Sequence, residues 1–353
     1  MSIFIHPDER QLVYMGRTEE YGGGVRFIFA GTSVTMRFRG TDVKCVIRNH
    51  KFYNTQEIGY VLDGRVGKVT YEHSEEDITL TIAEGLEEKD HELILYKRQD
   101  ASHYFEFKGF ELNDSADVLD PKPLPKRRIE CYGDSVSAGA VVEAIDHTAS
   151  NDPEKNDGIW DNSWYSYSMI TARNLGAQLN NIAQGGIAIF DRTGYYHAPD
   201  HIGMETVYNK VSYFPEAEGG YTDWDFSKYT PHVVLFAVGQ NDPHNEGGED
   251  FNISDPNYRE KWKSRYKAII SDLRSKYPKA VFVLLLTVLM HDPSWDKAID
   301  EIAREFGDPK ITHFVFRRTG AATPGHPRIT EQYEMAEELT AFISNMGDDI
   351  WRD

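Results

Sequence analysis

The sequence predicts two domains of different class: an all-β sandwich or jelly roll, followed by an α/β domain with a doubly wound parallel sheet. Two observations along the 353 residues predict this order. Apolar and polar residues alternate through much of residues 1–116, a pattern typical of half-buried antiparallel strands. From residue 129 to residue 353, apolar runs instead alternate with helix-like segments, which indicates strand–helix–strand units.

Five stretches of the N-terminal region have the period-two pattern or composition of strands. They are residues 34–39, 43–47, 78–82, 91–98 and 104–112. Glycine-containing turns such as Asp63-Gly64 separate them. Short strands at this spacing are typical of a sandwich or jelly roll, so we expect one such domain over residues 1–116.

A proline-rich stretch separates the two regions. Pro121, Pro123 and Pro125 lie within residues 117–128. Proline lacks the backbone N–H that helices and sheets use, and it favours extended chain. We therefore expect residues 117–128 to be a linker between the domains.

The C-terminal region carries four apolar runs and four helical patterns. The runs are residues 129–132, 233–238, 281–289 and 311–316, and the helical patterns are residues 163–179, 255–277, 296–306 and 330–345. The unbroken apolar run at 281–286 requires cover on both faces, as in a parallel sheet with helices on each side.

Composition excludes several classes of partner. The net charge of −19 disfavours nucleic acids and anionic membrane surfaces, and no apolar run approaches the length of a membrane span. The first ten residues lack the pattern of a signal peptide, so a cytoplasmic location is expected. Cys45 and Cys131 fall in different domains, which predicts two free thiols, with Cys131 a small buried residue. An oligomer is compatible with this sequence, which contains no feature that specifies one.

Four polar or glycine-rich loops follow predicted strands of the C-terminal domain. They contain Ser135, Gly186, Asn241 and His326. In doubly wound sheets the carboxyl ends of the strands meet at one edge, where ligands bind. We therefore expect these four residues to lie together.

This set of residues suits acyl transfer to a serine. Ser135 would be the nucleophile and His326 the general base. The backbone N–H groups of Ser135 and Gly186 and the side-chain amide of Asn241 would bind the oxyanion. The histidines lack the spacing of metal ligands, and this chemistry requires neither a metal nor another cofactor.

The same residues resemble the four sequence blocks of the SGNH (GDSL-like) hydrolase superfamily. Gly133-Asp134-Ser135, Gly186, Gly239-Gln240-Asn241-Asp242 and Gly325-His326-Pro327 match the blocks in order and rough spacing. This resemblance implies a flavodoxin-like three-layer fold for residues 129–353. A β domain placed before such a hydrolase resembles carbohydrate esterase family 2, whose members remove acetyl groups from xylan and glucomannan.

One position departs from the superfamily pattern. The aspartate expected three residues before the histidine is here Thr323. The simplest hypothesis is a dyad of Ser135 and His326, with a backbone carbonyl accepting the imidazole N–H. An acid from another loop, such as Asp292, is the alternative. Asp134 and Asp242 are interpreted as residues that fix their loops through backbone hydrogen bonds.

Two insertions beside the expected site are rich in aromatic residues. Trp160 and Trp224 are the best candidates for a platform that stacks on a sugar ring, and Glu143 for an acceptor of sugar hydroxyls. The predicted substrate is an acetylated oligosaccharide of the xylan or mannan type. The alternatives are a lipase or thioesterase that acts on other acyl esters, and a carbohydrate-binding protein without catalysis.

Overall fold

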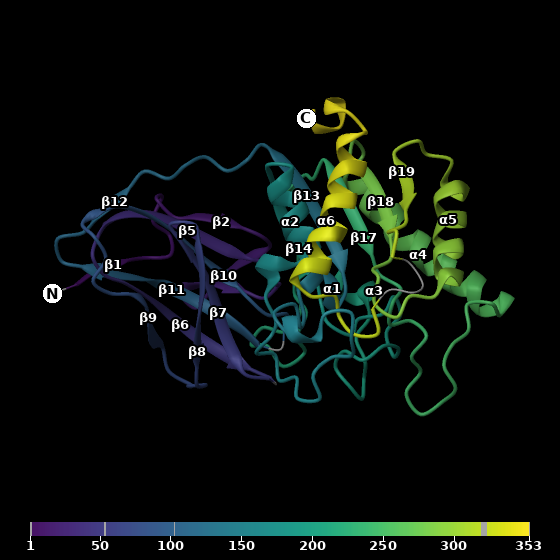
Figure 1. The fold of residues 1–353 in the computed structure, drawn as a ribbon, viewed down its shortest axis with the longest axis horizontal. Coiled ribbons are helices and arrows are strands. Elements are labelled where there is room, and N and C mark those ends of the chain that lie inside the picture. Colours follow the sequence, from purple (N-terminus) through teal and green to yellow (C-terminus); the bar gives the residue numbers. More distant parts are fainter. Residues whose placement is uncertain (1, 53, 102, 319–322, 353) are drawn as a thin grey trace.

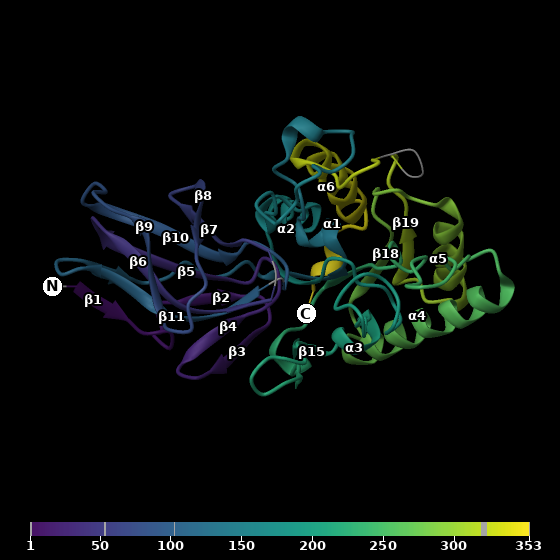
Figure 2. The same cartoon turned by 90° about the horizontal axis from the view of Figure 1, so that it is seen from below.

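The structure is a computed structural model that describes residues 2–52, 54–101, 103–318 and 323–352. The β-rich domain and the α/β domain lie side by side along the long axis of the molecule (Figures 1 and 2). The N-terminus lies at the far end of the β domain, and the C-terminus lies on the α/β domain. The predicted order of the two fold classes is therefore confirmed.

The N-terminal domain is a sandwich of two six-stranded antiparallel sheets. The first sheet contains β1 (Ser2–Ile5), β3 (Thr18–Tyr21), β4 (Gly24–Phe27), β6 (Val43–Lys51), β9 (Ile78–Ala83) and β11 (His103–Asn113). The second contains β2 (Val13–Met15), β5 (Ser33–Gly40), β7 (Gln56–Leu62), β8 (Arg65–Tyr71), β10 (Lys89–Lys97) and β12 (Asp117–Leu119). Inward residues such as Phe38, Leu95 and Phe105 form one apolar core between the sheets.

The linker is shorter than predicted at both ends. Asp117–Leu119 forms β12, which pairs with β5 of the sandwich, and β13 begins at Arg127. β12 precedes Pro121, so its backbone N–H groups remain available for the sheet. Only residues 120–126 connect the two domains without regular structure.

The C-terminal domain is built on a five-stranded parallel sheet. Its order is β14 (Ala177–Ala183), β13 (Arg127–Gly133), β17 (Val233–Ala237), β18 (Val281–Leu285) and β19 (Ile311–Phe314). The domain begins with β13, and β14 is added on one side of it. The chain then crosses over, and β17, β18 and β19 are added in turn on the other side of β13. This order makes the sheet doubly wound, and the carboxyl end of β13 lies at its switch point.

Helices cover both faces of this sheet, which gives the expected three layers (Figure 2). The helices are α1 (Ser135–Ala138), α2 (Tyr167–Asn174), α3 (Met204–Val207), α4 (Pro256–Lys276), α5 (Pro293–Phe306) and α6 (Ile329–Ser344). One core unites Tyr266 of α4 and Ile299 of α5 with the sheet. A second core, on the other face, unites Ile170 of α2 and Leu339 of α6 with it.

Local chemistry explains where the helices begin and end. Asp255 caps α4 by accepting hydrogen bonds from the N–H groups of Asn257 and Tyr258, and Pro256 occupies the first turn. The helix predicted over residues 163–179 is interrupted. It divides into a 3-10 turn at Ser163–Tyr165 and α2, and β14 begins just after Gly176 (φ +60°). Of the run at 281–289, only Val281–Leu285 forms the strand β18.

Smaller elements occupy the insertions and the C-terminal end. They are β15 (Lys210–Ser212), β16 (Thr222–Asp223) and 3-10 turns at Ile145–His147, Phe226–Lys228 and Asp348–Trp351. None of the helices in the described part of the chain has the length and apolar character needed to cross a bilayer. Cys45 and Cys131 are free, as predicted, and Cys131 is buried, as predicted, while Cys45 is buried as well; burial raises the pKa of each thiol to about 12.

A buried arginine joins the domains. Arg17, between β2 and β3, donates hydrogen bonds to the carbonyl oxygens of Tyr208 and Lys210 at 2.7 and 2.8 Å. Its guanidinium also bonds Glu130 of β13 at 3.1 Å and lies 5.3 Å from the ring of Trp224. The two domains therefore share polar and aromatic contacts in their interior.

Candidate active site

A cavity of about 600 Å³ opens at the carboxyl edge of the parallel sheet. Ser135, Gly186, Asn241 and His326 all line it. The structure thus brings together the four loops that sequence patterns placed at one edge of the sheet.

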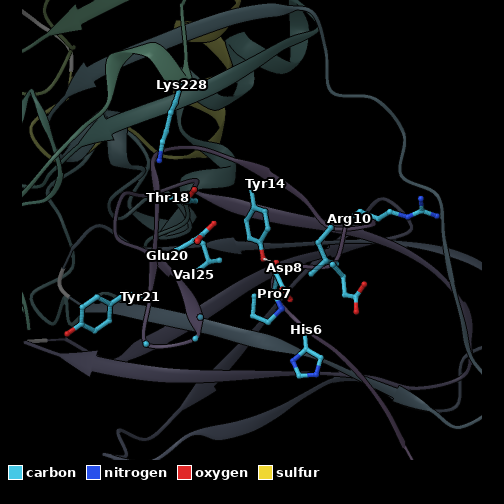
Figure 3. A pocket seen from close by; sticks show the side chains of 15 residues that line it. His6, Pro7, Asp8, Arg10, Tyr14, Thr18, Glu20, Tyr21, Val25 and Lys228 are labelled. Atoms are coloured by element: carbon cyan, nitrogen blue, oxygen red, sulfur yellow. Dashed lines mark hydrogen bonds between the residues drawn. The ribbon is translucent and has the colours of Figure 1, made fainter.

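A second hollow lies on the β domain, between the segment that begins at His6 and the β3–β4 hairpin (Figure 3). Tyr14 lines it and donates its hydroxyl to the carbonyl of Pro7. Among the described residues that line this hollow there is neither a serine nor a cysteine. Because the cavity at the sheet edge contains Ser135 and His326, it is the candidate active site.

Ser135 begins α1, directly after β13. The Asp134 side chain caps this short helix by accepting the N–H of Val136 at 3.0 Å. A Cβ atom at Gly133 would lie 2.1 Å from the Ser137 hydroxyl oxygen, so the tight turn requires glycine there. The Oγ of Ser135 lies 2.8 Å from Nε2 of His326. This is hydrogen-bond distance for a nucleophile and its base.

A carboxylate, rather than a backbone carbonyl, orients the histidine. Oδ2 of Asp152 lies 2.6 Å from Nδ1 of His326, and Oδ1 accepts the His326 backbone N–H at 2.8 Å. The dyad hypothesis is therefore wrong. Asp292, the acid considered from sequence, instead caps α5 by accepting the N–H of Ser294.

His326 and Arg328 together hold this acid in its ionised form. The guanidinium of Arg328, which is fully buried, lies 2.9 Å from Oδ1 of Asp152 and also donates to the carbonyl of Ala144. Partial burial raises the pKa of Asp152, but hydrogen bonds and charge from His326 and Arg328 outweigh it and hold that pKa well below its usual range. An ionised Asp152 keeps the proton of the neutral imidazole on Nδ1, which leaves Nε2 free to accept the serine proton.

The predicted oxyanion donors surround the same space. Gly186 has φ +76°, and a Cβ there would lie 2.9 Å from the Cβ of Tyr195, so only glycine suits this position. The amide of Asn241 donates one hydrogen bond to the carbonyl of Ile187 at 3.0 Å. That bond fixes the amide beside the cavity, and its second N–H can serve a ligand.

Asp134 and Asp242 fix loops, as predicted. Asp242 accepts hydrogen bonds from the N–H of Ile189 and, at 2.7 Å, from the indole N–H of Trp262. Burial raises the pKa of Asp242 to about 7 and that of Asp134 to about 6. Asp242 thereby ties the asparagine loop to the loop that follows Gly186.

The three residues predicted to bind sugar do not line the cavity. Both carboxylate oxygens of Glu143 are bonded, one to Asn162 at 2.7 Å and the other to the Arg98 guanidinium. Trp224 is buried against Arg17 in the interior. Trp160 is half-buried, and its carbonyl accepts the N–H of Glu143. Their insertions were correctly placed near the site, but side-chain contacts direct Glu143 and Trp224 elsewhere, and Trp160 is not among the residues that line the cavity.

Other residues form the cavity wall. Tyr195 stacks on His244 with ring centroids 3.9 Å apart and an interplanar angle of 13°. Four carboxylates line the cavity, namely Asp100, Asp152, Asp161 and Asp250, and no lysine or arginine is among its described lining residues. Asn54 and Asp100 come from the β domain. Asn54 and Asp100 carried no motif in the sequence, and only the docking of the domains brings them here.

Comparisons with known proteins agree with this geometry. Residues 14–122 match the family described as carbohydrate esterase 2 N-terminal. Cellulase/esterase CelE of Acetivibrio thermocellus is 31% identical over 96% of this chain and 40% of its own length. An acetylxylan esterase/glucomannan deacetylase of Cellvibrio japonicus is 28% identical over 65% of this chain and 60% of its own length. The chain thus spans about half the length of these two relatives.

A solved structure resembles the whole chain. It is a family two carbohydrate esterase from Clostridium thermocellum in complex with cellohexaose, with a TM-score of 0.77 and 28% identity over 97% of this chain and 100% of that one. The parallel sheet with its serine–histidine edge and glycine and asparagine loops defines the class of SGNH hydrolases. Within that class, the β sandwich and the relatives support an SGNH hydrolase related to carbohydrate esterase family 2.

Proposed function

We propose that this protein removes acetyl groups from O-acetylated oligosaccharides of the xylan or mannan type. The observation that carries the proposal is the hydrogen-bonded series of Ser135, His326 and Asp152, which opens into a cavity beside Gly186 and Asn241. Relatives named as a cellulase/esterase and an acetylxylan esterase/glucomannan deacetylase support a carbohydrate ester as substrate.

The first half of the reaction acylates the serine. His326 takes the Ser135 proton at Nε2 as Oγ attacks the acetyl carbonyl carbon, and ionised Asp152 stabilises the resulting imidazolium. The oxyanion accepts hydrogen bonds from the N–H groups of Ser135 and Gly186 and from the Asn241 amide. The carbon–oxygen bond to the sugar then breaks, and the sugar hydroxyl leaves with the proton from His326.

The second half hydrolyses the acetyl-enzyme. A water molecule in the cavity gives a proton to His326 and attacks the acetyl carbonyl carbon. Collapse of the second tetrahedral intermediate releases acetate and returns the proton to Ser135. Tyr195, which is exposed, and His244 both line the cavity, and their stack offers an aromatic edge against which a sugar ring can pack.

Proton NMR of acetylated manno- and xylo-oligosaccharides tests this proposal directly. The expected result is loss of acetyl signals and appearance of free acetate with the wild type, and neither change with Ser135→Ala. Aryl acetate and aryl octanoate are compared in parallel. Preference for octanoate, or unchanged oligosaccharides in the presence of wild-type enzyme, would contradict a carbohydrate acetyl esterase and favour a lipase or thioesterase.

A further inference from the structure

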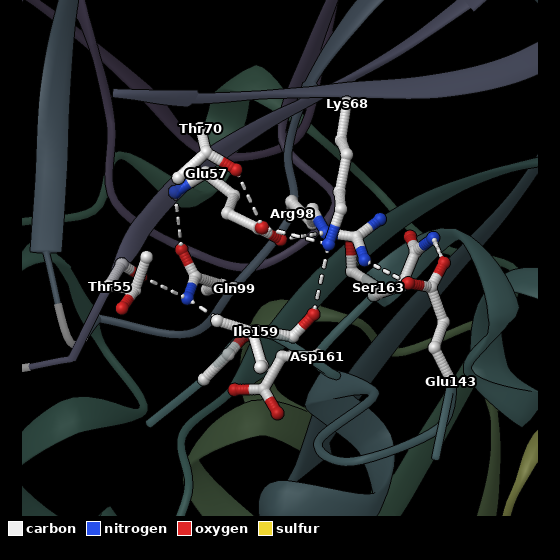
Figure 4. Close-up of polar contacts among 12 residues, drawn as sticks. Thr55, Glu57, Lys68, Thr70, Arg98, Gln99, Glu143, Ile159, Asp161 and Ser163 are labelled. Carbon is white, nitrogen blue, oxygen red and sulfur yellow. Dashed lines mark hydrogen bonds and ion pairs between the residues drawn. The ribbon is translucent and has the colours of Figure 1, made fainter. Parts of the chain in front are cut away.

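A short turn of the β domain contacts two loops of the candidate active site. This turn, residues 98–100, follows β10 and contains Arg98, Gln99 and Asp100. On one side it meets Gln184 and Gly185, directly before Gly186. On the other side it meets the loop of residues 143–163, which carries Asp152 (Figure 4).

Asp100 binds the glycine loop through its carboxylate. Oδ2 of Asp100 accepts the backbone N–H of Gly185 at 3.0 Å and the side-chain amide of Gln184 at 2.9 Å. The hydroxyl of Tyr213 donates to the opposite end of that amide, so Gln184 is fixed in this orientation. A Cβ at Gly185 would lie 2.6 Å from this carboxylate oxygen and 3.7 Å from the Cβ of Ser135. The glycine loop is thus seated between the β domain and the nucleophile.

The turn itself is held rigidly. Lys97, whose side chain is fully buried, donates to the carbonyl oxygens of Gln99 and Asp100 at 2.9 and 2.6 Å. Burial lowers the pKa of this lysine to about 7. The backbone of Lys97 also exchanges hydrogen bonds with Gly31 and Thr32 on the neighbouring turn. The position of Asp100 is therefore fixed by its own domain.

The same turn binds the loop that carries the acid. The Gln99 amide donates to the carbonyl of Gly158 at 3.0 Å, and its oxygen accepts the N–H of Glu57. The Arg98 guanidinium lies between Glu57 of the β domain and Glu143 of the loop (Figure 4). Lys68 adds a hydrogen bond to the carbonyl of Ile159 at 3.1 Å.

We propose that the β domain is part of the catalytic apparatus, with Asp100 as a positioning residue that acts through Gly185 on the oxyanion donor Gly186. The inference rests on the proposed serine-hydrolase function of the site. Asp100 acts through the glycine loop: without its carboxylate the Gly185 N–H loses its acceptor, and the neighbouring Gly186 N–H loses its fixed direction. Misaligned donors stabilise the transition state less, while binding of the ground-state ester changes little.

The test uses the full-length chain and two reactions at Ser135. One is hydrolysis of an aryl acetate, which gives kcat and KM. The other is labelling by a fluorophosphonate, in which the Oγ–phosphorus bond forms, fluoride leaves and His326 takes the serine proton. Labelling needs the nucleophile, the base and the oxyanion donors but no particular acyl ester. Asp90→Ala is the matched control, because Asp90 is an exposed aspartate of β10, the strand that precedes this turn, and pairs with Arg39.

For Asp100→Ala we expect kcat and the labelling rate to fall about 10- to 100-fold, as for other supporting residues of catalytic groups, with KM within about twofold. The final fraction of labelled protein should match the wild type, and Asp90→Ala should behave as the wild type in every assay. Asp100→Asn keeps a neutral oxygen acceptor, so its rates should fall between those of Asp100→Ala and the wild type. If Asp100→Ala does not fold, the rates measured for Asp100→Asn decide the proposal instead.

Wild-type labelling rates in the Asp100 variants would overturn the proposal. A smaller labelled fraction that reacts at the wild-type rate would also overturn it, because that result indicates a purely structural role. If the wild type is labelled but hydrolyses no acetyl ester, the proposed function fails while the labelling rates still decide the role of Asp100. A wild type that is not labelled at all contradicts both.

Discussion

Oδ2 of Asp152 lies 2.6 Å from Nδ1 of His326, although 174 residues separate the two in the chain. The acid therefore comes from a polar loop between α1 and α2, and not from the position three residues before the histidine. Arg328, two residues after the histidine, binds the same carboxylate. One loop thus supplies the acid, and the histidine loop supplies both of its side-chain partners, His326 and Arg328.

Replacing Asp152 by asparagine tests this arrangement. We expect kcat for acetyl esters to fall on the order of 10³- to 10⁴-fold, because an amide can donate to Nδ1, stabilise the wrong tautomer and leave the imidazolium uncompensated. Steady-state kinetics on an aryl acetate checks this, with circular dichroism to verify folding. Asp292→Asn is the matched control and should retain full activity, since Asp292 only caps α5. Equal activity of both variants would contradict the assignment.

The depressed pKa of Asp152 predicts a pH dependence of stability. A carboxyl whose folded pKa lies below its unfolded value, about 3.9 for aspartate, stabilises the fold above that value. The contribution is lost as the pH falls through the folded pKa. Melting temperatures should therefore differ most between wild type and Asp152→Asn above about pH 4, and converge at lower pH. A difference that grows as the pH falls below this range would refute the sign of the shift.

The oxyanion donors predict losses in kcat rather than in KM. Asn241→Ala removes a donor and should lower kcat on the order of 10²- to 10³-fold. Gly186→Ala should also lower kcat, because the φ of +76° at this position and the nearby Tyr195 leave no room for a Cβ. Kinetics on an aryl acetate measures both variants, and Asn245→Ala serves as the control for the asparagine, because Asn245 is not among the residues that line the cavity. Unchanged kcat in Asn241→Ala would remove this residue from the site.

The charge of the cavity predicts discrimination among oligosaccharides. Four aspartates line it; Arg328 pairs with one of them, Asp152, and burial raises the pKa of another, Asp161, to about 7. The remaining negative charge, with no lysine or arginine among the described lining residues, should repel carboxylate-bearing substrates. We expect a higher kcat/KM for neutral acetylated oligosaccharides than for ones that carry uronic acids, and a smaller gap at high ionic strength. Competition between the two classes, followed by NMR at low and high salt, measures the effect. A preference for the acidic substrate would contradict it.

The parts predicted well from sequence are those that local patterns determine. Period-two alternation identified the sandwich, and buried apolar runs identified the parallel sheet. Loops that follow parallel strands share an edge by topology, which is why Ser135, Gly186, Asn241 and His326 could be brought together without a structure. The boundary of the linker was wrong, because three residues before Pro121 extend the sandwich.

The predictions that failed concern side chains whose positions depend on tertiary packing. Asp152 lies in a polar stretch with no distinctive spacing, and only the folded loop aims it at the histidine. The sugar-binding hypothesis for Trp224 failed because a buried cation, Arg17, lies against its ring. The same hypothesis failed for Glu143 because Arg98 of the β domain pairs with its carboxylate. Asp100 was missed for the same reason: its role exists only across the interface of the domains.

The most direct test of the central claim is mass spectrometry of an acetyl-enzyme. The enzyme is mixed with excess aryl acetate, quenched rapidly in acid and digested, and the peptide that contains Ser135 is examined. We expect acetyl on the Ser135 hydroxyl in the wild type and none in Ser135→Ala. Turnover with acetyl on another residue, or Ser135→Ala that still hydrolyses the ester, would contradict it.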